Sequence, residues 1–334
     1  MFETTEVEET ATKGYEGRKA AIDFDEIAYV AAAGNETRGI RVKENVPFAT
    51  WKEHSTRTDF YKSIGGKSNA KDYVIEDVQY PFSIEKCYHK IDEMVQSILE
   101  RCKTEDYVGY MGSGSPRDFI ATVMQYKGQR GSMLRPVQLK EARQYCKERW
   151  NAIEVDGTQY EADDMLAIET ATSGAISVSQ DKDAYQVEGW LLKPAWAEPR
   201  WMDGFGYFDV DKSGKSDVAV GAGECFLAYQ CLVGDSSDNY KPTKLTKKNF
   251  GMAGAKKLID KCGNSLQLWG AVIEKYKEWY PEPFTYPHAY TGEEMIGTWH
   301  NMFNEYYMLA RMKRTLDDCA TGYDLLEALG VDYE

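Results

Sequence analysis

Three groups of carboxylates in this sequence are spaced so that they could meet and bind metal ions. In the first group, Glu161 and Asp164 stand at i and i+3 and would share one face of a helix, with Asp163 at the helix start. Two pairs follow along the chain, Asp181 with Asp183 and Asp235 with Asp238. Carboxylates about 4 Å apart repel by roughly 4 kcal/mol per pair at an effective dielectric constant of about 20. Their convergence would need hard divalent cations, so the pattern predicts a metal site.

Composition limits the class of protein. The chain has 334 residues, 43% hydrophobic and 28% charged, which is typical of a soluble globular protein, and no apolar run approaches the roughly 18 residues of a membrane span. Residues 1–17 lack a signal-peptide core and are expected to form a disordered acidic tail. Seven cysteines without a Cys-x-x-Cys motif and only four histidines argue against disulfide, zinc or histidine chemistry. We therefore expect a cytoplasmic protein.

The charge of the chain is unevenly distributed. A net charge of −14 argues at first sight against a nucleic-acid partner. Yet seven lysines face a single acid, Asp260, between positions 241 and 261, and a second basic stretch covers 117–143. A protein that concentrates its acids in a metal site can still present a basic track to phosphates.

Strands and helices alternate over the first two thirds of the chain. Apolar runs predict strands at 18–25, 107–111, 151–155 and 175–179, and helical spacing predicts helices at 51–64, 83–103 and 138–150. A hairpin is expected at 201–220, a helix at 224–233 and helical structure throughout the rest. This order predicts an α/β fold with a mainly parallel, doubly wound sheet flanked by helices. Ligands bind at the carboxyl ends of such strands, where Asp23 would lie.

Taken in order, these motifs resemble the 5′-nuclease family of flap endonucleases and 5′-3′ exonucleases, and within it the phage enzymes. The resemblance is carried by the three carboxylate groups, by Asp23 as the first carboxylate, and by the Tyr-Lys-Gly-Gln-Arg run at 126–130, which is similar to the family's arch segment. It covers about 18–261. It implies a PIN/5′-nuclease-like core over 18–233 with a helical arch at about 112–137. A helix-three-turn-helix and a C-terminal helical region would follow over 234–334.

The resemblance implies a metal-dependent 5′-3′ exonuclease or flap endonuclease that hydrolyses phosphodiester bonds near DNA 5′ ends and leaves 5′-phosphates. Two Mg²⁺ ions, or Mn²⁺ in their place, would activate water and stabilise the leaving oxygen. By motif, one ion would be held by Asp23, Glu161, Asp163 and Asp164, and the other by Asp181, Asp183, Asp235 and Asp238. Tyr126 would stack a terminal base, and Lys127 and Arg130 would contact the scissile phosphate.

The resemblance also implies contacts with the rest of the substrate. DNA with 5′ ends, nicks or flaps would be the partner, with RNA–DNA hybrids as a further candidate. The protein would serve DNA replication or repair beside replication proteins, in the host cytoplasm if a phage encodes it. Duplex phosphates would be bound by Arg117, Lys247, Lys248, Gly254, Lys256 and Lys257. The family's Gly-x-Gly turn, which can hold K⁺, is only partly present at 252–256.

One position departs from the family. Many members carry an Asp after the strand that corresponds to 107–111, where this chain continues with Gly-Ser-Gly at 112–114. Asp25 lies two residues beyond Asp23 and on its side of an extended chain, so it is our candidate to supply the missing charge. Metal-dependent cleavage that survives Asp25→Ala unchanged would disprove this hypothesis.

Two other functions stay open. Asp23 and Asp25, with the late Gly-Asp-x-x-Asp at 234–238, imitate phosphatases that use an aspartyl nucleophile, although Ile27 stands where those enzymes need Thr or Val. A non-catalytic DNA-structure-binding protein of the same fold is the second. The phosphatase hypothesis does not explain the 161–164 cluster, and a protein without chemistry would have no need of clustered acids that destabilise its fold.

Overall fold

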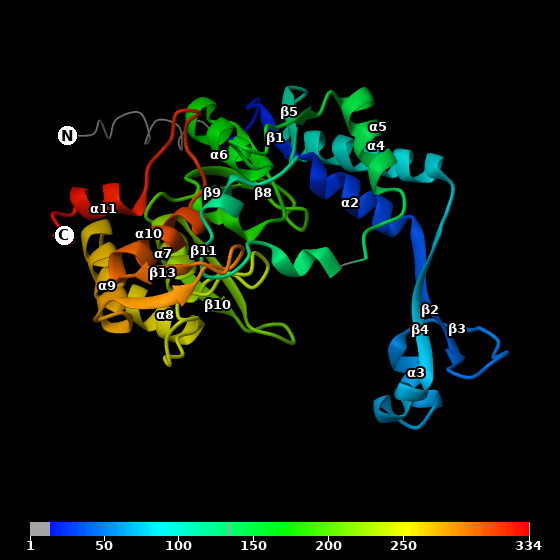
Figure 1. The fold of residues 1–334 in the computed structure, drawn as a ribbon. Helices are drawn as coiled ribbons and strands as arrows, with labels where there is room; N and C mark the ends of the chain where they lie inside the picture. The colour runs from blue at the N-terminus through cyan, green and yellow to red at the C-terminus, as the bar shows by residue number, and fades with distance from the viewer. Residues whose placement is uncertain (1–13, 133, 334) are drawn as a thin grey trace. The chain divides into compact units, whose positions relative to one another are not determined.

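The computed structural model describes residues 14–132 and 134–333, so residues 1–13 of the expected tail lie outside the described residues (Figure 1). The chain divides into two compact units. Unit 1 comprises Met1–Asp23, Ser97–Met133 and Ala152–Glu334, and unit 2 comprises Phe24–Gln96 and Leu134–Asn151. Among the described residues, no helix is both long and apolar enough to span a membrane.

Unit 1 is built on a six-stranded sheet with the order β6-β5-β1-β7-β8-β9. The strands are β6 (Ile153–Glu154), β5 (Tyr107–Met111), β1 (Ala20–Asp23), β7 (Ile176–Val178), β8 (Gly189–Leu192) and β9 (Arg200–Met202). All neighbours pair in parallel except β8 and β9. The first three residues of β1 are completely buried, as expected for a central strand covered on both faces. The predicted mainly parallel α/β sheet is confirmed.

Helix α6 (Ala162–Ser173) lies against the centre of this sheet, where it contacts β1, β5 and β7. Its buried side chain Leu166 joins a small core with Ala21 and Tyr110. The helix ends at Gly174, whose φ of 68° gives the left-handed cap that returns the chain to β7. The acidic first turn of α6 is therefore held over the carboxyl edge of the parallel strands.

A larger core is formed by helices from the C-terminal half of unit 1. They are α7 (Gly223–Val233), α8 (Met252–Ile259), α9 (Ser265–Trp279), α10 (Trp299–Ala310) and α11 (Gly322–Ala328). The fully buried Tyr276 packs edge-on against Phe303, and its hydroxyl donates to the Cys231 carbonyl at 2.6 Å. This packing fixes the end of α7, from which the 234–240 loop begins.

Parts of unit 1 differ from the expected elements. The residues after Asp238 are not all helical, because β12 (Phe284–Pro287) and β13 (Glu294–Gly297) form a hairpin. The expected hairpin at 201–220 is present as β10 (Tyr207–Asp211) and β11 (Val218–Ala222). In the segment that follows β5, described residues form two short 3-10 helices, η2 (Pro116–Phe119) and η3 (Gly128–Ser132). The helical arch is therefore not confirmed.

Unit 2 combines helices with a three-stranded antiparallel sheet of order β3-β2-β4. Its elements are α2 (Phe24–Gly34), β2 (Glu36–Glu44), β3 (Lys52–His54), α3 (Arg57–Ser63), η1 (Lys67–Asp72), β4 (Tyr73–Pro81), α5 (Leu139–Trp150) and α4 (Ile84–Cys102), which runs on into unit 1. The prediction of a helix over 51–64 is wrong for its first half, where residues 52–54 form the strand β3. Thr56 caps α3 by accepting from the Asp59 amide, and the residues before it pair with β2.

Candidate metal centre

Two neighbouring strands of unit 1 deliver carboxylates to one edge of the sheet. Strand β1 ends at Asp23, and β7, which pairs with it in parallel, is followed by Asp181 and Asp183. Asp181 caps the 3-10 helix η4 (Lys182–Gln186) by accepting from the Asp183 amide at 3.0 Å. As the sequence predicted, Asp23, Asp181 and Asp183 lie at the carboxyl ends of neighbouring parallel strands.

The start of α6 adds Asp163 to these carboxylates. Burial, followed by the charges of Asp181 and Asp23, raises the pKa of Asp163 well above its ordinary value. Its Oδ1 atom is buried and has no hydrogen-bond partner among the described residues. A buried carboxylate oxygen without a donor is a candidate metal ligand.

Asp164, in contrast, is fully engaged with protein donors. Arg117 contacts both of its oxygens, at 3.0 and 3.1 Å, and the backbone amides of Glu161 and Lys313 contribute one further bond each. Burial would raise the pKa of Asp164, but Arg117 holds it below the ordinary value. Its bonds orient the first turn of α6, and its expected role as a metal ligand stays a prediction.

Arg117, which was expected to bind duplex phosphates, lies in the interior of unit 1. The residue is 5% exposed, its Nη1 donates to Glu161 at 2.6 Å, and its other donors reach the carbonyls of Leu309 and Arg311. Burial disfavours its charge, yet Asp164 and Glu161 raise its pKa well above the usual value. This arginine is a buried counterion that ties η2, α6 and the end of α10 together.

The 126–130 run folds onto the acidic cluster. Tyr126 is 5% exposed, and its hydroxyl contacts Asp238 at 2.8 Å and Glu161 at 3.2 Å, so it does not present its ring to a terminal base. Lys127 Nζ donates to Glu161 at 2.6 Å and lies 3.9 Å from Asp238, and Arg130 contacts Asp238 at 2.9 Å. The Lys127 amide donates to the Asp238 carbonyl at 2.9 Å. Two cations therefore stand at the edge of the cluster.

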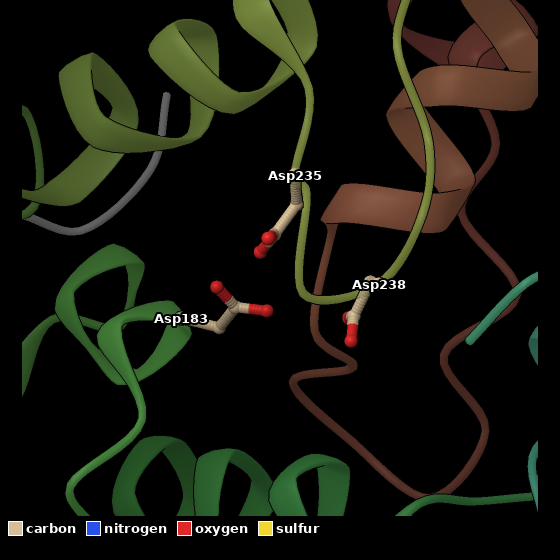
Figure 2. Close-up of side chains that lie close together, drawn as sticks. All are labelled: Asp183, Asp235 and Asp238. Carbon is tan, nitrogen blue, oxygen red and sulfur yellow. The ribbon is translucent and has the colours of Figure 1, made fainter. Parts of the chain in front are cut away.

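Asp183, Asp235 and Asp238 point into a common space (Figure 2). Each offers an oxygen, and these oxygens all lie within 4.8 Å of one another. Burial, then the charge of Asp181, raises the pKa of Asp183 well above its ordinary value, and burial also raises the pKa of Asp238. The buried Asp235 and Asp238 and the half-buried Asp183 are arranged to hold a divalent cation. Oxygen-only ligands fit a hard ion such as Mg²⁺ or Mn²⁺.

The loop that carries Asp235 and Asp238 has little freedom. Gly234 has a φ of 86°, and a Cβ there would lie 2.3 Å from the Tyr240 carbonyl oxygen. The backbones of Asp235 and Tyr240 exchange hydrogen bonds of 2.9 and 3.0 Å across this loop. Only glycine fits at the start of such a closed loop, which holds both carboxylates on one side.

Sequence reasoning did not single out Lys182 and Gln230. Lys182 Nζ makes a short ion pair with Asp235, and Gln230 Nε2 donates to Asp183 at 2.6 Å. The position of Lys182 between Asp181 and Asp183 was the available signal. Gln230 is a polar residue in the apolar helix α7, where a buried amide needs a hydrogen-bond partner. A glutamine at that position was the only feature of the sequence that indicated a role for it.

The other expected site residues lie elsewhere. Asp25 belongs to α2 in unit 2 and forms an ion pair with Arg143 of α5, so its expected role stays a prediction. Lys247, Lys248 and Lys257 are exposed, whereas Lys256 contacts Asp260 at 3.0 Å. Gly254 lies on α8, where a Cβ would meet the Phe250 ring at 3.0 Å.

Comparisons with known proteins add little to this geometry. No family model matches the chain, and no curated protein matches it. Among solved structures, it is similar to a bacteriophage T5 flap endonuclease described as a pseudo-enzyme–product complex with DNA and metal ions. The two share 18% identity over 56% of this chain and 70% of the other, with a TM-score of 0.39. A similarity at this level carries no conclusion about the reaction, so the side-chain geometry must support any proposal.

We predict that Arg117→Met destabilises the protein by about 3–5 kcal/mol, because it leaves the buried Asp164 without its cation and Glu161 with Lys127 alone. Chemical denaturation measures this loss. Arg130→Met is the matched control, since the Arg130 side chain is 45% exposed and pairs with Asp238 at the edge of the cluster; it should cost under about 1 kcal/mol. Equal losses in the two variants would contradict the role given to Arg117.

Metal binding should stabilise the protein more at pH 7.5 than at pH 5. The raised pKa values of Asp163, Asp183 and Asp238 mean that the folded state binds protons more readily than the unfolded state. The free energy of unfolding of the metal-free protein therefore falls as pH rises from about 4 through the raised pKa values of these carboxyl groups. A bound cation offsets that loss at neutral pH. Saturating Mg²⁺ at about 100 times its dissociation constant would add about 2.7 kcal/mol.

Thermal unfolding with Mg²⁺ and with EDTA at both pH values measures this difference. Asp183→Asn is the control, because it removes one repelling charge and one ligand: it should stabilise the metal-free protein at pH 7.5 and reduce the Mg²⁺ shift. The same Mg²⁺ shift at both pH values would contradict the prediction.

Proposed function

We propose that this protein is a metal-dependent nuclease that hydrolyses phosphodiester bonds near DNA 5′ ends, as a 5′-3′ exonuclease or flap endonuclease. The observation that supports it best is the approach of Asp183, Asp235 and Asp238 beside two cationic side chains of the 126–130 run. A carboxylate cluster can hold divalent ions, and adjacent cations can bind the phosphate on which those ions act. Nucleotide phosphodiesters are a substrate class that is cleaved with both.

In this proposal two groups of carboxylates hold the ions. Asp183, Asp235 and Asp238 would hold one, and Asp163 with Asp23, Asp181 and Glu161 would hold the other. Bound divalent ions supply a water of lowered pKa and stabilise charge on the leaving oxygen. Arg117 and Asp164 serve as positioning residues, because they fix the start of α6 through buried bonds.

Lys127 and Arg130 would stabilise the phosphate during cleavage. Their side chains are 23% and 45% exposed, so both are open to solvent beside the buried cluster. Although burial opposes its charge, Glu161 and Asp238 raise the pKa of Lys127, so it stays cationic at neutral pH. A fixed positive charge next to a reacting phosphate stabilises the negative charge that develops in the transition state.

The nuclease proposal is tested with a 5′-labelled flap and a nicked duplex. We expect cleavage with Mg²⁺, loss of cleavage with EDTA, and products with 5′-phosphates. Asp235→Asn should lose activity by about 10²-fold or more while still binding DNA. Binding of DNA without cleavage under any metal condition would instead favour a DNA-structure-binding protein. Release of phosphate from a small ester, without strand cleavage, would favour a phosphatase.

Lys127→Ala should lower turnover by about 10²-fold and change DNA affinity less than threefold, because the charge acts mainly in the transition state. Single-turnover kinetics and binding in Ca²⁺ separate the two effects. Lys127→Arg should recover part of the turnover, and the exposed Lys215→Ala is the control for loss of one positive charge. Equal losses of turnover and affinity would argue against a transition-state role.

The exposed lysines near α8 are proposed to bind duplex phosphates, with Gly254 and Lys256 of α8 beside them and K⁺ as a candidate ion at the start of that helix. Replacing both Lys247 and Lys248 by Ala should weaken duplex binding and reduce the salt slope by about 0.9 for each lysine. Fluorescence anisotropy over a range of KCl concentrations measures the slope. An unchanged slope would remove this segment from the DNA track.

A further inference from the structure

Residues 36–81 of unit 2 take no part in the metal centre of unit 1. They form the β3-β2-β4 sheet with α3 and η1, around a small core of Ile40, Val42 and Phe60. The proposed nuclease chemistry uses no side chain from this segment. Its surface nevertheless has the features of a binding site, and these gather at the loop between β2 and β3.

The tip of this loop exposes apolar side chains. Phe48 is fully exposed at 103%, Val46 is 56% exposed, and Pro47 lies between them. Phe48 has a φ of 64°, which is uncommon for residues other than glycine and strained for a bulky side chain. A loop that needed only this backbone shape would carry glycine or asparagine there. An aromatic side chain held in solvent by a strained backbone indicates a contact with a partner.

Positive charges surround the same loop. Arg41 and Lys43 on β2 lie over the Trp51 ring, at 4.7 and 4.8 Å from its centre. Lys43 and Lys52 also line a hollow of about 510 Å³ beside Phe48. Aromatic and aliphatic side chains form much of its wall, and its other lining residues include these two lysines, His54 and Glu44. The hollow therefore offers apolar surface next to cations.

Basic residues are frequent on both sides of the loop. Between Arg38 and Lys71 the sequence holds eight arginines and lysines against three acids, Glu44, Glu53 and Asp59, in a chain with a net charge of −14. Two of the acids are engaged locally: Asp59 accepts from Ser55 and Thr56, and Glu53 accepts from Tyr80. Four more acids, Glu36, Asp72, Glu76 and Asp77, lie elsewhere in 36–81, and three of them pair with Arg38, Arg41 and Arg57. The cations that line the hollow at the loop are therefore Lys43 and Lys52.

We propose that the β2–β3 loop binds single-stranded nucleic acid, with Phe48 as the stacking residue and Lys43 and Lys52 as phosphate contacts. Exposed aromatic side chains beside cations are how proteins bind unpaired bases and their backbone. A duplex hides its base faces, so the exposed ring favours a single strand. The proposal does not depend on nuclease activity, because binding can be measured in EDTA without metal-dependent cleavage.

The test uses the full-length protein and a fluorescent oligothymidylate of 20 nucleotides in EDTA. Phe48→Ala should weaken binding about tenfold, from the loss of one stacking platform. Lys43→Ala with Lys52→Ala should reduce the salt slope by about 0.7 for each lysine. Phe82→Ala with Lys86→Ala is the matched control: Phe82 is 47% exposed and Lys86 lies 5.3 Å from its ring, outside the 38–71 segment.

A second measurement uses the unaltered protein. Light-induced cross-linking to an oligonucleotide with 5-iodouracil should modify the tryptic peptide 44–52, which contains Phe48. Adducts found only outside this peptide would overturn the proposal. The proposal would also be overturned if both variants kept the affinity and salt slope of the wild-type protein. An equal loss of affinity in the Phe82 and Lys86 control would overturn it as well. If these variants lose binding to polyglutamate while their oligonucleotide binding is unchanged, the loop binds an acidic protein and not a single strand, and the proposal is wrong.

Discussion

Repulsion among buried carboxylates is the constraint on which the rest of unit 1 depends. Asp163, Asp183 and Asp238 all have raised pKa values because they are buried close to other acids. The fold tolerates this because cations are built in beside them: Arg117, Lys127, Arg130 and Lys182 each contact at least one carboxylate. Close packing of like charges costs stability in any fold, and proteins accept that cost mainly at functional sites.

The cations divide the carboxylates into two kinds. Asp164 is neutralised by a buried guanidinium with ideal pairing, so its pKa is lowered and its oxygens are occupied. Asp163 and Asp183 keep raised pKa values and have fewer donors. The first kind orients the backbone, and the second kind is available for a ligand. Adjacent residues in one acidic turn thus differ in role, because only one of them faces the interior arginine.

The C-terminal helices contribute to the site at long range. They fix the end of α7, and the Gly234 loop then turns Asp235 and Asp238 toward η4. The carbonyls of Leu309 and Arg311, at the end of α10, hold the other donors of Arg117. The carboxylate geometry therefore depends on packing well away from the sheet edge.

The sequence by itself determined the local features: the buried β1 run, the acidic start of α6, and the carboxylate pairs after β7 and α7. Each of these features depends on residues close together in the chain, so the sequence pattern alone predicts it. Tertiary structure decided which charges meet. Arg117 and Tyr126 turn inward, Lys182 pairs with Asp235, and residues 52–54 form a strand with β2 and not the start of a helix. These outcomes depend on segments distant in the chain, because pairing and burial are settled only when those segments pack together.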